Sequence, residues 1–296
     1  MPYKNQSKAY IYVSLTVLLW STVATAFKIA LRYHNYIQLL LVANITSLLV
    51  FTAIMANSDR FSQLKKTNLP NLGLSAIQGL FNPFVYYLLV FKAYSLLPAQ
   101  IAQPANFIWP VILMLLSVPL LKQPLNLNGM ASLLISFAGV LILSSRGNPG
   151  SFQIVEPFGI ILALLSSLVW AFFWILNLKD TRDNIIKLFL SSLFSGFYIT
   201  IMAYVTGNLF TIFSKPLFAA IYVGLFELGI TYTFWLKALQ LSKSTEKVSC
   251  FVYLTPFISL IFIHFILHEK IYYTSLVGLC LIVGGILVGQ IKVKKK

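Results

Sequence analysis

The sequence predicts an all-α integral membrane protein with ten transmembrane helices in two inverted five-helix repeats. Three observations carry this prediction: the composition, the number of long apolar runs, and a repeat that relates the two halves of the chain. Of the 296 residues, 58% are hydrophobic and only 10% are charged, whereas a soluble domain has roughly 25% charged residues. Most of the surface is therefore expected to face lipid, which excludes an ordinary soluble enzyme and a disordered protein.

Ten apolar runs are long enough to cross a bilayer as helices, because a spanning helix needs about 20 apolar residues. They cover residues 9–31, 37–56, 72–94, 99–120, 127–145, 157–178, 185–205, 217–239, 247–267 and 273–291. Runs of this length and apolarity indicate helices rather than the alternating strands of a membrane barrel. The connectors between them, such as 146–150 and 179–183, are too short to hold a soluble domain.

The distribution of basic residues predicts the orientation. With the N-terminus inside, 15 Lys and Arg residues fall in inner segments, 4 fall in outer loops and 3 lie within helices. Since Lys and Arg mark cytoplasmic loops, both termini are predicted in the cytoplasm and the protein in the plasma (inner) membrane. Nucleic acid is not an expected partner despite the net charge of +15, because no basic patch with base-stacking aromatics lies outside the apolar runs.

The cysteines and the N-terminus add two exclusions. Cys250 and Cys280 both lie in apolar runs, so a disulfide framework is not expected. The first apolar run is too long for a signal peptide and ends without a small-residue cleavage site.

The two halves of the chain are related by an internal repeat. Gly79-Leu80-Phe81-Asn82 recurs 145 residues later as Gly224-Leu225-Phe226-Glu227, and seven of eighteen positions are identical at this shift. Each half, 1–148 and 149–296, then holds five helices. Because five is odd, the second half enters the membrane from the opposite side, an arrangement typical of secondary transporters.

Several segments resemble the EamA-type ten-helix branch of the drug/metabolite transporter (DMT) superfamily. The first helix carries Leu18-Leu19-Trp20-Ser21 and then Lys28, similar to that family's Trp-Gly/Ser…Lys helix. Leu267-His268-Glu269 is similar to the family's Leu-Gly-Glu before the last helix, which is itself rich in glycine: Gly278, Gly284, Gly285 and Gly289. The chain departs from the family pattern at Asn44, where many members carry a basic residue, and at Gln123 and His268, which replace Glu and Gly.

The resemblance implies that helices one to four and six to nine surround a central cavity, with helices five and ten at the periphery. It also implies transport of small organic solutes such as amino acids, nucleosides, sugar phosphates or amphipathic drugs, without ATP. The Gly-x-x-x-x-Gly-Lys-Ser/Thr motif of ATP-driven motors is absent from the sequence, and no cofactor is expected.

Glu227 is the first candidate for a substrate-binding and coupling residue. It lies near the middle of the eighth run, with no basic residue within nine positions. A charged, unpaired carboxylate at that depth costs roughly 2.5–3.5 kcal/mol, so Glu227 must be protonated, paired or placed in a wet cavity. Asn82 is its repeat mate. The alternative is structural: a neutral Glu227 clamped to Asn44 or Asn82 of a neighbouring helix.

Three lysines lie inside the predicted helices. Lys28, near the outer end of the first helix, either extends to the interface or faces the cavity, where it could hold a substrate carboxylate or pair with Glu227. Lys92 and Lys237 lie closer to the interfaces, which favours extension of both side chains to the membrane surface.

Aromatic repeat mates indicate the walls of a solute cavity. Trp20 and Trp170 lie about half-way along their helices, whereas interfacial tryptophans would lie at the ends. Tyr87 and Tyr232 are also repeat mates and would add hydroxyl groups. Lipid-facing or core packing is the alternative. In the fourth and ninth helices, Trp109-Pro110 and Tyr253 followed by Pro256 predict kinks at mirrored places.

Two further motifs have open interpretations. Gly285-x-x-x-Gly289 permits close helix approach, either in a homodimer or within one chain. His264 and His268 lie one helical turn apart, a spacing that can bind zinc, but the sequence is not His-Glu-x-x-His. The alternative is that Glu269 caps the loop before the tenth helix.

The sequence thus predicts a secondary transporter of small organic metabolites, amino acids or drug-like solutes, with export favoured. It would work by alternating access around a midplane site, with proton coupling at Glu227. Its partners would be the solute and the lipid bilayer. The alternatives are an intramembrane metal-dependent enzyme that uses His264 and His268, and a passive channel or lipid scramblase.

Overall fold

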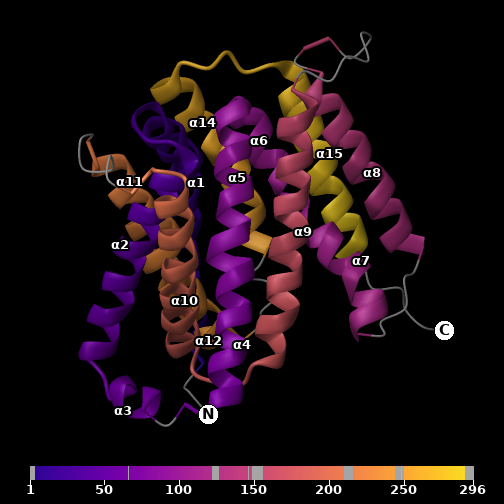
Figure 1. Cartoon of the computed structure of the whole chain (residues 1–296). Coiled ribbons are helices and arrows are strands. Elements are labelled where there is room, and N and C mark those ends of the chain that lie inside the picture. The colour runs from indigo at the N-terminus through magenta and orange to yellow at the C-terminus, as the bar shows by residue number, and fades with distance from the viewer. Residues whose placement is uncertain are drawn as a thin grey trace, which may run out of the picture.

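The computed structural model describes residues 4–65, 67–121, 127–145, 147–148, 156–209, 216–243, 248 and 250–290, and every regular element in them is a helix (Figure 1). The first half contains α1 (Gln6–Tyr33), α2 (Tyr36–Ala56), α3 (Arg60–Leu64), α4 (Leu69–Gly79), the π-helical turn η1 (Leu80–Val85), α5 (Tyr86–Leu96), α6 (Ala99–Asn106), α7 (Trp109–Leu121) and α8 (Leu127–Ser144). The second contains α9 (Pro157–Lys179), α10 (Asn184–Val205), α11 (Phe218–Val223), the π-helical turn η4 (Gly224–Gly229), α12 (Ile230–Leu241), the 3-10 turn η5 (Cys250–Leu254), α14 (Thr255–Leu267) and α15 (Tyr273–Gln290).

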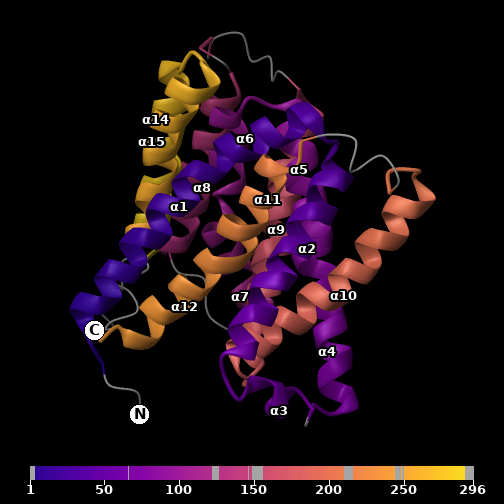
Figure 2. The same ribbon diagram turned by 90° about the vertical axis from the view of Figure 1, so that its left-hand side faces the viewer.

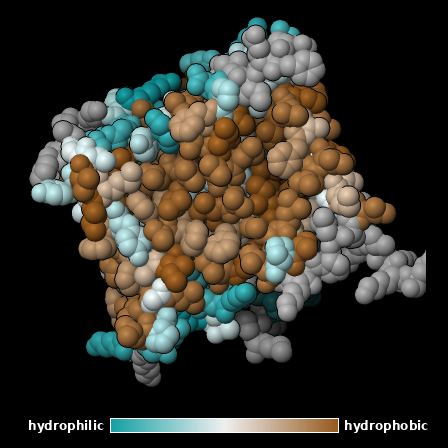
Figure 3. Space-filling model, turned by 45° about the vertical axis from the view of Figure 1, so that its right-hand side comes forward, coloured by the Kyte–Doolittle hydropathy of each residue, from teal (hydrophilic) through white to brown (hydrophobic). Residues whose placement is uncertain are grey.

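The predicted all-α membrane fold is confirmed. In the described residues, nine helical stretches are long and apolar enough to cross a membrane, and Phe251–Leu267 is a shorter apolar helix. Large apolar side chains such as Leu49, Leu134, Phe197 and Phe265 are more than 60% exposed, which water would penalise and lipid does not. Figure 3 shows the resulting apolar band across the molecule, with hydrophilic residues gathered above and below it.

The fourth and ninth predicted helices differ from the observed ones, because each is interrupted. The run predicted at 99–120 is divided into α6 and α7, and the one predicted at 247–267 begins as η5 and continues as α14. Pro110 and Pro256 each occupy the second position of the following helix, where the missing N–H is harmless and the ring favours helix initiation. The helical geometry therefore changes beside both mirrored prolines, where the sequence predicts kinks.

The repeat is also visible in the backbone. The third membrane helix contains η1 and the eighth contains η4, at positions that the 145-residue shift brings together. Single π turns inside α-helices often mark functional sites. Asn82 and Glu227 lie inside these two turns, so the pair of repeat mates chosen from the sequence lies where both helices depart from regular geometry.

The fifth and tenth membrane helices, α8 and α15, lie side by side at the edge of the bundle, as the family resemblance implies (Figure 1). Glycines let their backbones meet. A Cβ atom on Gly139 would lie 2.7 Å from the carbonyl oxygen of Gly278, and one on Gly285 would lie 2.3 Å from Ser136 Oγ. Gly289 likewise faces Ser132. The Gly285-x-x-x-Gly289 motif thus forms a helix contact within the chain. A homodimer stays a prediction.

The start of α1 and the end of α12 lie on the same side of the bundle, toward the bottom of Figure 2. Asn5 donates its backbone N–H to the carbonyl oxygen of Leu241 at 2.9 Å, and Lys4 donates to that of Gln240 at 3.0 Å.

Three predictions fall in or beside segments outside the described residues. They concern Gln123, the side chain of Cys250 and the boundary between the halves after residue 148.

Asp180 and Arg182 form an ion pair that ties the second half to the first. Arg182 Nη2 lies 2.6 Å from Asp180 Oδ2, and Arg182 Nη1 donates to Asn71 O and Ser75 Oγ of the first half, at 3.0 and 2.9 Å. Gln78 adds a hydrogen bond to Asp180 at 3.2 Å. Burial raises the pKa of Asp180, but the hydrogen bonds and charge of Arg182 outweigh this and leave the pKa below its usual value.

We expect this pair to make thermal stability fall at low pH. A carboxyl group whose pKa is lowered in the folded state stabilises it above the unfolded pKa of about 3.9, and this contribution is lost as the pH falls through the folded pKa. Between pH 6 and pH 3, the melting temperature of the wild type should therefore fall by more than that of the Asp180→Asn variant. Asp59→Asn, which changes an exposed carboxylate, is the matched control. Identical pH profiles for all three proteins would contradict the role given to Asp180.

Candidate functional site

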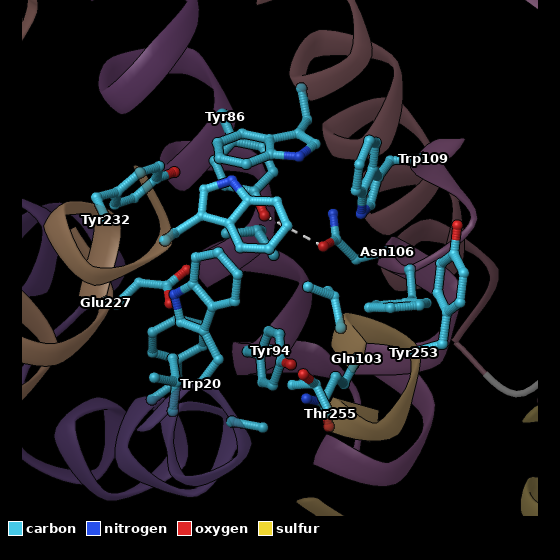
Figure 4. A pocket seen from close by; sticks show the side chains of 18 of the residues that line it. Trp20, Tyr86, Tyr94, Gln103, Asn106, Trp109, Glu227, Tyr232, Tyr253 and Thr255 are labelled. Carbon is cyan, nitrogen blue, oxygen red and sulfur yellow. Dashed lines mark hydrogen bonds between the residues drawn. The ribbon is translucent and has the colours of Figure 1, made fainter. Parts of the chain in front are cut away.

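A cavity of about 170 Å³ lies between the two halves, and all five tryptophans of the chain line it: Trp20, Trp109, Trp170, Trp174 and Trp235 (Figure 4). The walls come from both sides of the repeat. In the first half they are α1, α5, α6 and the start of α7, and in the second half they are α9, η4, α12, η5 and the start of α14. The cavity thus lies where a family of this architecture is expected to hold its solute.

Glu227 is the charged side chain of this cavity. It projects from η4, is partly buried, and accepts a hydrogen bond from the Tyr87 hydroxyl at 2.9 Å. Tyr87 lies on α5 of the other half, so the bond crosses the interface between the repeats. Figure 4 shows the carboxylate in the same space as the Trp20 and Tyr232 rings.

Aromatic rings form one connected group around the cavity. The Trp170 ring lies 4.7 Å from Tyr86, 6.1 Å from Tyr232 and 6.5 Å from Trp109, measured between ring centroids. Trp20 lies 6.0 Å from the same Tyr232. Tyr232 therefore connects the two tryptophans that the repeat predicts, and the three rings form one continuous wall.

Tyr87 and Asn82 lie behind this wall rather than in it. Both are buried and line a smaller space together with Tyr232, Ser191 and Phe51, among others. The Asn82 amide oxygen has no hydrogen-bond partner. In the described structure Tyr87 thus contacts Glu227 from behind the wall and does not line the main cavity.

Asn44 and Lys28 lie away from the main cavity. Asn44 is fully buried between α2 and α10, where its side-chain amide donates to Ser192 O at 3.0 Å. Lys28 donates to the carbonyl oxygens of Tyr94 and Leu97, both at 2.9 Å. It neither lines the cavity nor pairs with Glu227, because its ammonium group is used to bind the carbonyl ends of α5.

Lys92 and Lys237, the lysine repeat mates, are not cavity residues either. The Lys92 ammonium lies 5.1 Å from the centre of the Tyr36 ring, and that of Lys237 lies 5.6 Å from the Tyr12 ring. Each thus has an aromatic partner on a neighbouring helix, within the distance of a cation–π interaction.

Glu269 caps a helix other than the expected one. Its carboxylate accepts from the backbone N–H of Ala99 at 2.9 Å and of Gln100 at 3.4 Å, at the N-terminus of α6. The prediction that it caps the loop before the tenth helix is therefore wrong. A helix N-terminus offers unpaired N–H groups and a positive dipole end, and that of α6 lies beside the loop that carries Glu269.

The two histidines of the zinc alternative do not converge with other ligands. His268 has a left-handed backbone (φ 56°) that ends α14, and His264 Nδ1 lies 3.1 Å from the backbone oxygen of Glu269. Among the described residues, no group of three His, Cys, Asp or Glu side chains could hold a metal ion.

Some residues that line the cavity are not predicted from the sequence. Asn106 accepts a hydrogen bond from the Tyr86 hydroxyl at 3.2 Å and donates to Ser166 at 2.8 Å, while the buried Gln103 oxygen has no partner. Gln103, Asn106 and Trp109 recur every three residues within the run 99–120, a spacing that places them on one helical face and indicates a face toward a cavity.

Comparisons with known proteins agree with this architecture. The EamA-like transporter family matches residues 7–145 and 157–289. The chain is 23% identical to the uncharacterized transporter YvbV of Bacillus subtilis (strain 168), over 98% of this chain and 93% of that one. It is 22% identical to an uncharacterized transporter of Archaeoglobus fulgidus, over 94% and 96% of the two chains.

A solved structure shares the fold, with a TM-score of 0.62 and 19% identity over 97% of both chains. The family match covers both halves of the chain, and the curated relatives are named as transporters. The protein is a multi-pass membrane transporter and not an enzyme, and it belongs to the EamA-like transporter family.

Proposed function

We propose that this transporter is a secondary exporter of small organic solutes, which binds its solute in the tryptophan-lined cavity and couples transport to protons at Glu227. The observation that carries the proposal is the hydrogen bond between Tyr87 of the first half and Glu227 of the second, at the wall of that cavity. A change in the protonation or contacts of Glu227 acts directly on the interface between the repeats.

Alternating access is supported by polar contacts that join the halves at both ends of the bundle. At one end Arg182 binds Asn71 and Ser75 near the start of α4. At the other end Glu269 binds the N-terminus of α6. Opening the cavity to either side requires one of these sets to separate while the other is kept, as in rocking of one repeat against the other.

The experiment uses protein reconstituted in liposomes that contain a pH-sensitive dye. With an imposed pH gradient, addition of a transported solute should accelerate the dissipation of the gradient and drive the solute above its equilibrium concentration. Protein-free liposomes are the control. Solute flux that no pH gradient can drive uphill would instead support a passive channel or a scramblase.

The plasma-membrane location and the orientation are tested by cysteine labelling of intact cells. We expect a cysteine at position 148 to react with an impermeant reagent from outside and one at position 63 to be protected, because basic residues mark the cytoplasmic side. Both positions are exposed in the fold. The background should lack Cys250 and Cys280. Protection at 148 with labelling at 63 would reverse the orientation.

A further inference from the structure

The cavity is lined by a negative side chain, although the protein as a whole is strongly positive. The chain carries a net charge of +15, yet among the described residues that line the cavity the one charged side chain is Glu227. Lys28, Lys92 and Lys237 lie elsewhere: Lys28 binds carbonyl oxygens, and Lys92 and Lys237 lie over tyrosine rings. In the part of the chain that the structure describes, the cavity therefore offers a carboxylate that forms no ion pair with a basic side chain.

The aromatic walls of the cavity, like Glu227, favour a positively charged solute. The face of an aromatic ring is electronegative, and tryptophan attracts a cation most strongly. All five tryptophans line this one cavity. Glu227 lies in the same space as the ring of Trp20 (Figure 4). Trp170 is joined to Trp20 through Tyr232.

Other solute classes find fewer partners here. A zwitterionic amino acid needs a cationic or strongly donating group for its carboxylate, and a phosphate needs several donors. Apart from Glu227 and the tyrosine and tryptophan groups, the polar side chains among the described lining residues are Gln103, Asn106 and Thr255. Asn106 is already bonded to Tyr86 and Ser166. An anionic group would face a carboxylate and the negative faces of the rings.

We propose that the solute is a small organic cation, whose ammonium-type group lies against Glu227 and the tryptophan rings. This inference rests on the proposed function, since both place the solute in the same cavity, and it specifies the charge of the solute. A cavity of about 170 Å³ limits the solute to a small molecule, because an apolar cavity of roughly 150 Å³ accommodates benzene.

A pair of probes with the same shape and different charge tests the proposal. Choline is a quaternary ammonium ion, and 3,3-dimethylbutan-1-ol has carbon in place of its nitrogen. Because every tryptophan lines the cavity, intrinsic fluorescence of the detergent-purified protein reports on its occupancy. We expect choline to change the fluorescence saturably and to bind about tenfold or more tightly than the alcohol, as desolvated cation–π contacts and a partly buried carboxylate together imply.

Two kinds of variant separate the contributions. Glu227→Gln should weaken choline binding about tenfold while leaving binding of the alcohol unchanged, and Glu156→Gln, at an exposed position before α9, should change neither. Biosynthetic replacement of tryptophan by mono- and difluorotryptophan withdraws electron density from the ring faces. Binding of radiolabelled choline should weaken stepwise with fluorine content, while binding of the neutral alcohol should not.

The outcomes distinguish this inference from the proposed function. Equal or tighter binding of the alcohol, or binding of neither probe, would overturn the cation assignment, while uphill flux of a neutral solute would leave the transporter proposal intact. Choline affinity that ignores both Glu227→Gln and fluorination would also overturn the assignment. Charge-selective binding without proton-driven flux would uphold the cavity chemistry and contradict the proton-coupled mechanism.

Discussion

Glu227→Gln should abolish proton-driven accumulation of the solute in proteoliposomes while leaving solute exchange in place. Glutamine keeps the size of the side chain and can still accept a hydrogen bond from Tyr87, which lies 2.9 Å from the Glu227 oxygen. It cannot gain or lose the proton. With one proton exchanged per monovalent cation, a pH gradient of one unit supports an accumulation ratio of about tenfold, and the variant should reach only equilibrium.

The control for this prediction is Glu156→Gln, which removes an exposed carboxyl group that makes no cap hydrogen bond. It should accumulate solute as the wild type does. If Glu227 is only a structural clamp between the repeats, Glu227→Gln should retain uphill transport and Glu227→Ala should lower the melting temperature. That result would remove Glu227 from the mechanism and leave the aromatic wall as the solute-binding surface.

Gly285→Ala should cost about 1–3 kcal/mol of folding free energy, the usual cost of overpacking a well-packed contact. The added methyl group would lie 2.3 Å from Ser136 Oγ and 2.9 Å from the Ser132 carbonyl oxygen on α8. A side-chain hydroxyl can move, but the helix backbone of Ser132 cannot do so without separating α8 from α15. We expect the melting temperature in detergent to fall by several degrees.

Gly284→Ala is the matched control in the same helix. A Cβ atom at Gly284 would have no atom within 4 Å, and alanine in a helix is favoured over glycine by up to about 1 kcal/mol. Its melting temperature should be unchanged or higher. Neither α8 nor α15 lines the cavity, so solute binding should survive in both variants. Equal melting temperatures would contradict the close α8–α15 contact.

The sequence by itself determined the membrane fold, the repeat and the need to neutralise or solvate the carboxyl group of Glu227. These depend on local properties: a run of about 20 apolar residues has little choice but a spanning helix, and a carboxyl group within one must be neutralised or solvated wherever the helix packs. The mirrored prolines Pro110 and Pro256 likewise act through their own backbone, so the two helix breaks follow from the sequence.

The tertiary structure alone decided which face of each helix meets the cavity. The helices are apolar nearly all around, because lipid and core favour the same residues, so periodicity does not separate the two environments. This is why the sequence predicts Tyr87 in the cavity wall although the residue lies behind it, and why it does not indicate Tyr86 and Trp235, which line the cavity.

The sequence also does not predict which side chains from distant segments become partners. The sequence position of Lys28 suggests a lysine at the membrane interface, whereas its hydrogen bonds show that it binds the carbonyl oxygens at the end of α5. Glu269 lies next to the last helix in sequence and caps α6 in space. Both outcomes depend on which helix end lies nearby, since unpaired N–H and C=O groups at helix termini bind the closest ion of the right sign, and only the packing of the two repeats sets that distance.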